Sequence, residues 1–215
     1  MDNEGILKAI KKLREGSKKR KFSQGLDLIV NLKQIDIKKP DQKVESFLVL
    51  PNDNGKKLKI CAFVDKELIN EAKSVFDKAI SKEDFPKVSK KELKNIAKEF
   101  DFFVAQSNCM VDVAKVFGKS LGSRGKMPNP KAGCVITPGS NLKELYNRLQ
   151  KTIRLATRNE PIIKVLIGKD SMEDKKIQEN IMSVYQSLLQ TLPQEKSNIK
   201  NILLKFTMSS PVQIG

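Results

Sequence analysis

The clearest candidate for a binding site is the stretch from Gly118 to Ile136, which combines turn-forming and basic residues. It contains four glycines before Cys134, two prolines within three residues and no acidic residue. The basic residues in it, together with one just upstream, are Lys115, Lys119, Arg124, Lys126 and Lys131. Glycine and proline are typical of turns, and basic residues without counter-charges favour an anionic partner. The sequence therefore predicts a loop whose cations and backbone N–H groups can hold phosphate.

Further candidates lie near the two ends of the chain. Eight basic residues and one acidic residue occur between Lys8 and Lys21, and Phe22 follows directly. This run is either a solvated tail or a strip that contacts phosphates, and Phe22 can pack on a sugar or base or into the core. Lys169 and Ser171 follow a predicted strand. Backbone N–H groups and a hydroxyl there suit a phosphate or a 2′-OH, although Ser171 can equally cap a helix.

The net charge limits the kinds of partner. It is +16, from 41 basic and 25 acidic residues, which favours nucleic acid or an acidic membrane surface, with solubility alone as the alternative. The sequence has no apolar run of about 18 residues, and its N-terminus lacks the apolar segment of a signal peptide. We therefore expect a soluble, cytoplasmic protein that binds no membrane.

The composition argues against common catalytic sites. Histidine is absent, which removes Ser-His-Asp and Cys-His chemistry and the commonest zinc ligand. Cys61, Cys109 and Cys134 are widely spaced, as buried apolar residues are. The GKS tripeptide that begins at Gly118 resembles the end of a P-loop, but Val113 stands where that motif needs glycine. We expect no catalytic residue, no metal and no cofactor, with a nucleotide-dependent enzyme as the alternative.

The elements that must position these residues follow from apolar spacing, capping pairs and turn residues. In the outer parts of the chain, they are helices at 2–13 and 26–32, strands at 44–50 and 161–168, a helix that starts at the pair Ser171 and Asp174, and a long strand from Ile202 to the C-terminus. In the middle, they are strands at 58–64 and 101–105, a helix at 67–80, a helix capped by Ser89 with Glu92, a helix at 108–117 capped by Ser107 and ended by Gly118, and a helix capped by Asn141 that continues to Ile153.

This order of elements predicts an α/β protein of two domains. Residues 62–155 alternate strands with helices, as units with parallel strands do. The flanking parts, 1–61 and 156–215, are each too short to bury a good core alone. We therefore expect one discontinuous domain built from both ends of the chain and a second domain inserted within it, with two crossings that can act as a hinge.

The glycine–proline stretch also resembles a family signature. LGSRGKMPNPKAGCVI closely resembles LGPRGxMPNPKxGTV of the family of large-subunit stalk ribosomal proteins. The segments RKFSQGLDLIVNLKQIDIKKPDQKVESFLVLP, VLIGKDSM and KFTMSSPVQI resemble other family segments in the same order. The resemblance extends over nearly the whole chain, and the N-terminal segment and short length resemble archaeal members.

The resemblance implies a terminal α+β domain with a split β-α-β sheet and an inserted Rossmann-like domain. It implies a non-enzymatic protein that binds large-subunit rRNA at the mobile stalk of the ribosome, beside the tRNA exit site. Such a protein assists release of deacylated tRNA, represses translation of its own mRNA and is a monomer when free. Carried over by position, the main RNA-binding residues are Lys21, Phe22, Ser23, Asp27, Gly168, Lys169, Ser171, Thr207, Met208 and Ser209. The secondary contacts to RNA or tRNA are Arg124, Lys126 and Lys131.

The chain departs from the family pattern at three positions. Ser123 replaces a proline, which should loosen the turn, and Cys134 replaces a threonine. Ser209 replaces the glycine of a Thr-Met-Gly triplet. If that glycine lets RNA approach the backbone, the Cβ of Ser209 weakens binding. We expect the change to be tolerated, because the other contact positions are intact.

Overall fold

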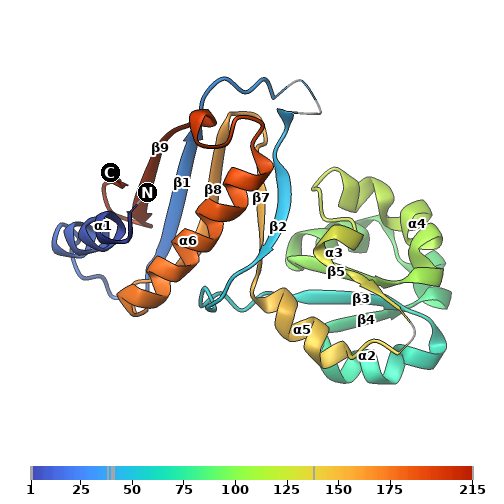
Figure 1. Ribbon diagram of the computed structural model, residues 1–215. Coiled ribbons are helices and arrows are strands. Elements are labelled where there is room, and N and C mark those ends of the chain that lie inside the picture. Colours follow the sequence, from blue (N-terminus) through green and yellow to red (C-terminus); the bar gives the residue numbers. More distant parts are fainter. Residues whose placement is uncertain (1, 38, 40–41, 138, 215) are drawn as a thin grey trace. The chain divides into compact units, whose positions relative to one another are not determined.

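The chain folds into two compact units. The computed structural model describes residues 2–37, 39, 42–137 and 139–214 (Figure 1). The terminal unit joins Met1–Lys56 and Lys151–Gly215, and the inserted unit is Lys57–Gln150. The boundaries predicted from the sequence, after residues 61 and 155, lie five residues beyond these. The fold is mixed α/β, as predicted.

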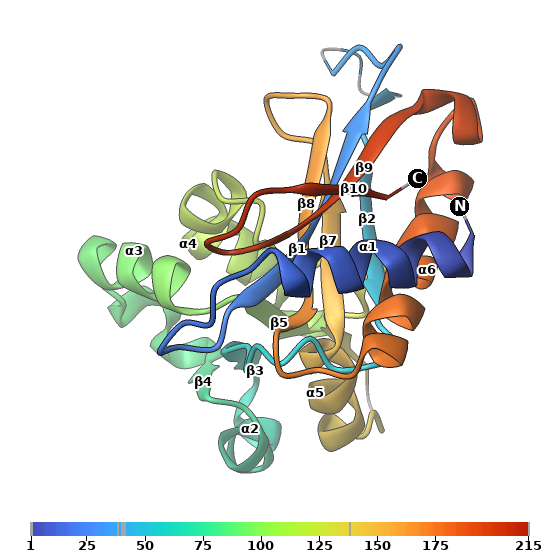
Figure 2. The same cartoon turned by 90° about the vertical axis from the view of Figure 1, so that its left-hand side faces the viewer.

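The terminal unit contains two long helices, a four-stranded sheet and a separate strand pair (Figures 1 and 2). Its elements are α1 (Asn3–Glu15), β1 (Gly25–Leu32), β2 (Glu45–Val49), β7 (Thr152–Ala156), β8 (Ile162–Lys169), α6 (Asp174–Thr191), β9 (Ile199–Phe206) and β10 (Val212–Ile214). The larger sheet is antiparallel in the order β10-β9-β1-β8, and β2 pairs with β7.

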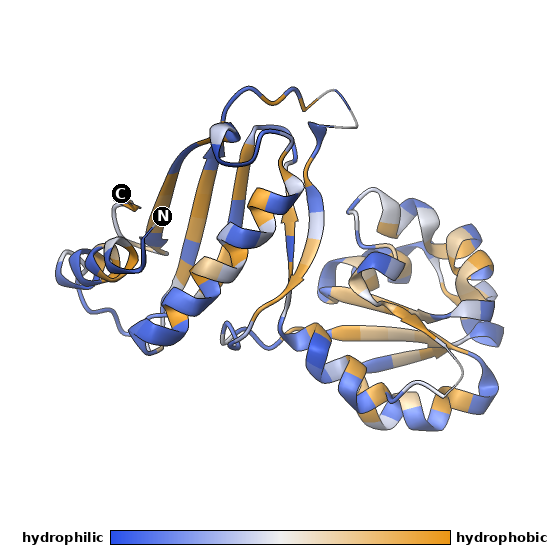
Figure 3. Cartoon of the chain, viewed as in Figure 1, coloured by the Kyte–Doolittle hydropathy of each residue, from blue (hydrophilic) through white to orange (hydrophobic). Residues whose placement is uncertain are grey.

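One face of the larger sheet is buried. Every second residue of β1 is buried and the residues between are half-buried. Buried side chains of α1, α6 and the sheet form a single apolar cluster, which includes Ile10, Leu28, Val165 and Ile181. Figure 3 shows the strands mainly in orange and the helices in alternating orange and blue. Burial of these apolar side chains therefore fixes the sheet against α1 and α6.

The predicted helix at 26–32 is wrong, because this segment is strand β1. Leu26, Ile29 and Val30 have helical spacing, but Leu26, Leu28, Val30 and Leu32 also alternate with period two. The sheet uses the second pattern, because only that pattern puts all four side chains into one core. The single long strand predicted from Ile202 to the C-terminus is also wrong: β9 ends at Phe206, and after a turn β10 pairs antiparallel with β9.

The inserted unit is a parallel sheet with helices on both faces. Its elements are β3 (Ile60–Val64), α2 (Ile69–Val75), β4 (Lys78–Ser81), α3 (Lys90–Glu99), β5 (Phe102–Gln106), α4 (Met110–Gly122), β6 (Val135–Ile136) and α5 (Leu142–Gln150). The strand order is β4-β3-β5-β6, and all three pairings are parallel. Helices α3 and α4 contact each other, and so do α2 and α5; Figure 1 shows the two pairs on opposite sides of the sheet. The predicted parallel α/β unit is confirmed.

Three predicted helix boundaries in this region are wrong. The segment 67–80, predicted as one helix, contains a short 3-10 turn, helix α2 and the unpredicted strand β4. Just before β4, the Asp77 carboxylate accepts a hydrogen bond from the Ile60 N–H (2.9 Å). Helix α4 runs through Gly118 to Gly122, since a helix tolerates glycine at a cost of about 1 kcal/mol. Helix α5 ends at Gln150, so Ile153 lies on strand β7.

In the inserted unit, two predicted capping residues are confirmed and one is not. The Ser89 hydroxyl accepts from the Glu92 N–H, and the Glu92 carboxylate accepts from the Ser89 N–H (3.3 and 2.8 Å), which completes a capping box. The Asn141 side-chain carbonyl accepts a hydrogen bond from the Lys143 N–H at the start of α5 (3.1 Å). Ser107 makes no such bond, because it lies in a 3-10 turn that precedes α4.

Candidate nucleic-acid interface

Three separate segments meet at one end of the larger sheet in the terminal unit. Strand β1 is antiparallel to both neighbours, so Gly25 at its start pairs with Lys169, and Leu26 pairs with Phe206. The residues around the start of β1 and the ends of β8 and β9 therefore lie together. We call residues 21–25, 168–171 and 207–209 the sheet-end surface. It includes every predicted main contact except Asp27.

Direct hydrogen bonds join the three segments. The Gly25 N–H donates to the Thr207 hydroxyl (3.2 Å), and the Thr207 N–H donates to the Gly25 carbonyl (3.0 Å). The Ser23 hydroxyl donates to Asp170 Oδ1 (2.7 Å). Ser23 and Thr207 therefore hold the surface together, in addition to any contact they make with a partner.

Two large apolar side chains are exposed on this surface. Phe22 is 52% exposed and Met208 is 60% exposed. Apolar side chains of this size are ordinarily buried, and where they cluster outside the core they mark a contact site. The structure therefore decides between the alternatives for Phe22: it lies outside the core, where its ring can stack on a base or pack on a sugar.

The predicted contacts around the end of β8 have different environments. Lys21 and Ser171 are exposed, and Lys169 is half-buried. The alkyl chain of Lys169 lies against Gly55, where an added Cβ would be 3.0 Å from the lysine Cδ. The alternative role of Ser171 as a helix cap is wrong, because α6 begins three residues later, at Asp174.

Asp27 lies further along β1, outside the sheet-end surface. In the sheet register its neighbours are Leu166 on β8 and Lys205 on β9. Burial raises the pKa of Asp27, and the positive charge of Lys205 offsets part of that shift. Its carboxylate belongs to the half-buried face of the sheet, the face opposite the helices.

Arg14 on α1, which the sequence analysis did not single out, supports the turn between β8 and α6. Its guanidinium donates to the carbonyls of Asp170 and Met172 (2.6 Å each) and to Asp174 Oδ1 (2.8 Å). An arginine fork can bind three acceptors at once because its donors are fixed in one plane. Its position in a basic run conceals this role, because every neighbouring cation has the same sequence signal.

Gln24 is a second supporting residue that the sequence analysis missed. It is 4% exposed, and its side-chain carbonyl accepts from the Met208 N–H (3.1 Å). Its backbone carbonyl accepts from the Asp170 N–H (3.0 Å). One buried glutamine therefore connects all three segments. A buried polar residue just before a strand is the sequence signal that could have indicated it.

Glycines allow close packing at the strand ends. A Cβ at Gly168 would lie 2.8 Å from the Met172 sulfur, and a Cβ at Gly25 would lie 2.8 Å from Cδ1 of Leu166. Both distances are too short for real side chains, so larger residues would move these neighbours. Glycine at these positions therefore keeps the sheet end closely packed.

Ser209, which replaces the family glycine, fits its turn. Its hydroxyl accepts from the Phe206 N–H (3.0 Å), and its own N–H donates to the Phe206 carbonyl (3.1 Å). Among the described residues, positive φ outside glycine occurs only at Gln34 and Glu195. Ser209 is therefore unstrained and makes a hydrogen bond that glycine cannot make.

Asp170 is ionised within this surface. Burial alone would raise its pKa. Other effects outweigh burial and hold the pKa below its usual value: hydrogen bonds from the Gln24 backbone, the Ser23 hydroxyl and the Ser171 backbone, and the charge of Arg14. The carboxylate thus takes part in the hydrogen bonds that join the segments.

The glycine–proline loop of the inserted unit is held by its own contacts. Gly125 and Gly133 have φ values of 61° and 69°, a conformation that favours glycine. Lys126 Nζ donates to the carbonyls of Ala97 (3.1 Å) and Phe100 (2.6 Å) at the end of α3. Lys126 therefore caps the C-terminus of α3, whereas the sequence analysis predicted it as a contact to RNA.

The other predicted residues of this loop remain on the surface. Arg124 and Lys131 are exposed, and both remain candidates for a secondary contact. Ser123 has a φ of −59°, within the range of proline, so the backbone keeps the conformation that the family residue would impose. Cys134 is 2% exposed, and burial raises its pKa to about 11.

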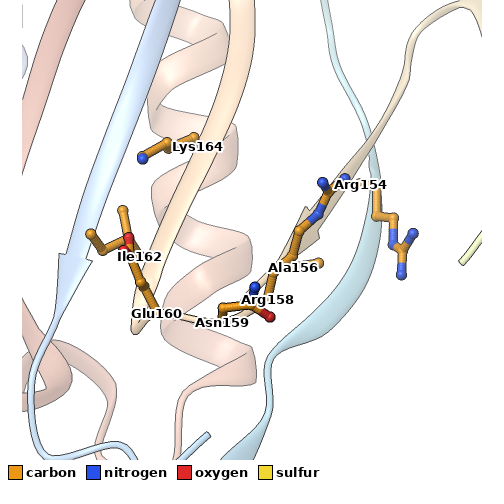
Figure 4. A pocket seen from close by; sticks show the side chains of 7 residues that line it. All are labelled: Arg154, Ala156, Arg158, Asn159, Glu160, Ile162 and Lys164. Atoms are coloured by element: carbon orange, nitrogen blue, oxygen red, sulfur yellow. The ribbon is translucent and has the colours of Figure 1, made fainter. Parts of the chain in front are cut away.

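A basic hollow in the terminal unit lies between β7 and β8 (Figure 4). Arg154, Arg158 and Lys164 contribute its positive charge, and Glu160 contributes a carboxylate. Arg154 also makes an ion pair with Glu45 at 2.6 Å. The hollow shows that positive charge extends beyond the sheet-end surface.

The inserted unit does not present a nucleotide site at the expected place. In open parallel sheets ligands bind where the strand order reverses, here at the ends of β3 and β5. Side chains bridge this place, because the Asp65 N–H donates to Gln106 Oε1 (2.9 Å) and Asn108 Nδ2 donates to Asp65 Oδ2 (3.4 Å). The GKS tripeptide lies inside α4, whereas a P-loop precedes a helix.

These features define a basic protein with an exposed binding surface. Exposed apolar side chains lie beside cations at a sheet end, and the described residues contain no group of three His, Cys, Asp or Glu side chains placed to hold a metal. No helix in the described ranges has both the length and the apolar character needed to span a membrane.

Comparison with known proteins identifies the family. The model of the Ribosomal protein L1p/L10e family matches residues 10–210, and the chain belongs to this family. It is therefore a structural ribosomal protein and not an enzyme. The alternative of a nucleotide-dependent enzyme is excluded by this membership.

Curated relatives match along the full chain. The large ribosomal subunit protein uL1 of Methanothermococcus thermolithotrophicus is 38% identical, with 100% of this chain and 99% of the relative covered. The protein of the same name from Thermoplasma volcanium is 36% identical, over 100% and 98%. That of Nanoarchaeum equitans is 39% identical, over 95% and 97%. The resemblance to archaeal members is confirmed.

Proposed function

We propose that this protein is a constituent of the large ribosomal subunit that binds rRNA at the mobile stalk through the sheet-end surface. The observation that carries the proposal is the convergence of three distant segments, which exposes Phe22 and Met208 beside Lys21 and Lys169. Stacking on exposed side chains and cationic contacts to phosphate are two of the interactions that bind single-stranded or looped RNA.

The finer parts of the proposal concern tRNA and mRNA. At the stalk, beside the tRNA exit site, the protein assists release of deacylated tRNA, and Arg124 and Lys131 make the secondary contact. It also represses translation of its own mRNA, which mimics the rRNA site. Support comes from the family membership and from the exposure of the two cations.

The test is RNA binding by variants that remove exposed side chains only. Phe22→Ala should weaken binding to a stalk rRNA fragment by about 1–3 kcal/mol, the usual effect of losing an aromatic stacking partner. Met208→Ala should also weaken binding, through the loss of its apolar contact with RNA. Val49→Ala is the matched control, because Val49 is a 45% exposed apolar residue of the same unit. Filter binding measures the affinities. Equal affinity of all three variants and the wild type would remove the sheet-end surface from the proposal.

A further inference from the structure

A basic pocket lies beside the sheet-end surface, between the end of α1 and the turn before α6. Its volume is about 480 Å³. Lys18, Lys19 and Arg20 line one side, Asp170 and Ser171 line the other, and the nearly buried ring of Phe206 also faces it. The three basic residues are not among the contacts implied by the family resemblance.

We propose that this pocket is a phosphate-binding site that takes one phosphodiester of the RNA strand bound at the sheet-end surface. The proposal rests on the proposed function. A strand with a base on Phe22 brings a neighbouring phosphate close to the pocket, because Arg20 is only two residues away, at most about 7 Å along the chain. Contact by lysine and arginine at such a site positions an RNA without reading its sequence.

The charges in the pocket favour an anion. Lys18, Lys19 and Arg20 are exposed, and none of them makes an ion pair within the described part of the chain. Arg14, by contrast, is bound to Asp174. The one carboxylate that lines the pocket, Asp170, already accepts hydrogen bonds from Ser23 and backbone N–H groups. Three available cations therefore face one carboxylate that is internally bonded.

The end of α1 does not cancel this attraction. Carbonyl groups at a helix C-terminus carry partial negative charge that would repel a phosphate. Here the Gly16 N–H donates to the Lys12 carbonyl (3.0 Å) and the Ser17 hydroxyl donates to the Leu13 carbonyl (2.5 Å). These bonds satisfy carbonyls of the last turn, so the cations determine the local potential.

The pocket also has a fixed shape. Arg14 holds the opposite wall through the carbonyls of Asp170 and Met172, and Gln24 holds the same turn through its backbone carbonyl. Phe206 also lines the pocket, and because it is only 3% exposed its ring is fixed by packing in the core. The pocket therefore combines a turn fixed by hydrogen bonds with exposed lysines, which can adjust to a bound phosphodiester.

The test compares two triple variants with the same change in net charge. Lys18→Gln, Lys19→Gln and Arg20→Gln together remove the cations of the pocket. The control removes three exposed lysines at the opposite end of the sheet: Lys33→Gln, Lys196→Gln and Lys200→Gln. Binding of a stalk rRNA fragment is measured over a range of KCl concentrations. The plot of log affinity against log salt should be less steep for the pocket variant by about 0.7–0.9, the contribution of one neutralised phosphate.

Two outcomes separate the pocket from the wider proposal. If the wild type binds the stalk fragment no better than an unrelated structured RNA, the proposed function fails. If the wild type discriminates but the pocket and control variants have equal slopes, only the pocket fails. A single neutral methylphosphonate linkage, moved along the fragment, gives a second readout. One position should weaken binding by the wild type and have no further effect on the pocket variant; the absence of such a position overturns the pocket.

Discussion

Arg14 provides the sharpest test of how the sheet-end surface is held. Replacing it with alanine removes three hydrogen bonds from the turn between β8 and α6, at 2.6, 2.6 and 2.8 Å. The carbonyls of Asp170 and Met172 and the carboxylate of Asp174 then lose their donor. Because these groups determine the path of the chain past Ser171, the change should affect both stability and RNA binding.

The size of the effect follows from the exposure of the groups. A hydrogen bond to a charged partner contributes about 1.5–3 kcal/mol when it is buried. The side chains of Arg14 and Asp174 are 33% and 35% exposed, so water can replace part of each interaction. A surface ion pair adds about 1 kcal/mol at most. We therefore expect Arg14→Ala to lower the free energy of unfolding by about 2–3 kcal/mol, less than the sum of three buried bonds.

The measurement is urea unfolding followed by far-UV circular dichroism, because the chain has no tryptophan. Lys12→Ala is the matched control: it removes the same charge from the last turn of the same helix, and Lys12 is exposed. Arg14→Lys should recover less than half of the loss, since an ammonium cannot form the planar fork. Affinity for the rRNA fragment should fall about tenfold in Arg14→Ala, equivalent to about 1.4 kcal/mol. Unfolding free energies of Arg14→Ala and Lys12→Ala within about 0.5 kcal/mol of each other would refute the supporting role of Arg14.

Three further predictions follow from the geometry. The pKa of Asp170 is lowered in the folded protein, so this carboxylate stabilises the fold above its ordinary pKa of 3.8, and the stabilisation is lost as the pH falls below that value. The stability difference between the wild type and Asp170→Asn should therefore be present at neutral pH and absent in acid. A difference that does not change with pH would contradict this. The three thiols are buried, and burial raises the pKa of Cys61 to about 12 and that of Cys134 to about 11. A thiol reagent at mildly alkaline pH should therefore label the protein only as fast as it unfolds. Immediate labelling of the folded protein would show that these thiols are accessible. Ser209→Gly should cost about 1 kcal/mol of stability through the lost hydrogen bond to the Phe206 N–H and should change RNA affinity less than twofold in filter binding; a large gain in affinity would show that the serine Cβ obstructs RNA.

The sequence alone was sufficient for the parallel α/β unit but not for its strand edges. Strands β3 and β5 are continuous apolar runs, and the capping box at Ser89 marks a helix start, so these elements follow from local patterns. Strand β4 is short and continues an amphipathic pattern directly after α2. Its strand conformation depends on pairing with β3, which no local pattern contains.

The prediction for β1 failed for a related reason. Leu26 to Leu32 satisfies helical and strand spacing at once, and only the tertiary core decides between them. The error matters for the site, because a helix there would not place Gly25 opposite both Lys169 and Thr207. Phe22, Lys169 and Ser171 were candidates from local patterns, and the other contacts were inferred from family resemblance. The antiparallel pairing of β1 supplies the physical reason why these distant residues belong together.

Supporting residues were harder to predict than surface residues. Phe22 was noticed because it follows a basic run, and Met208 because it lies in a triplet that resembles the family's. Arg14 and Gln24 have no such signal, because their roles depend on which carbonyl and N–H groups the fold brings near them. Lys126 is the converse case: its sequence context indicates a surface cation, while the end of α3 engages its ammonium.

The hydrogen bonds within the sheet-end surface determine how its hydroxyl groups can contact RNA. The hydroxyl of Ser23 donates its proton to Asp170, and the hydroxyl of Thr207 donates to the Gly25 carbonyl (3.3 Å). The hydroxyl of Ser209 donates to the Ser210 carbonyl (3.0 Å). A hydroxyl has one proton but two lone pairs, so these groups retain acceptor capacity and have no free donor. Ribose 2′-OH groups can donate to them, whereas phosphates, which only accept, cannot. These three hydroxyl groups therefore suit the ribose, and the lysines of the surface suit the phosphates.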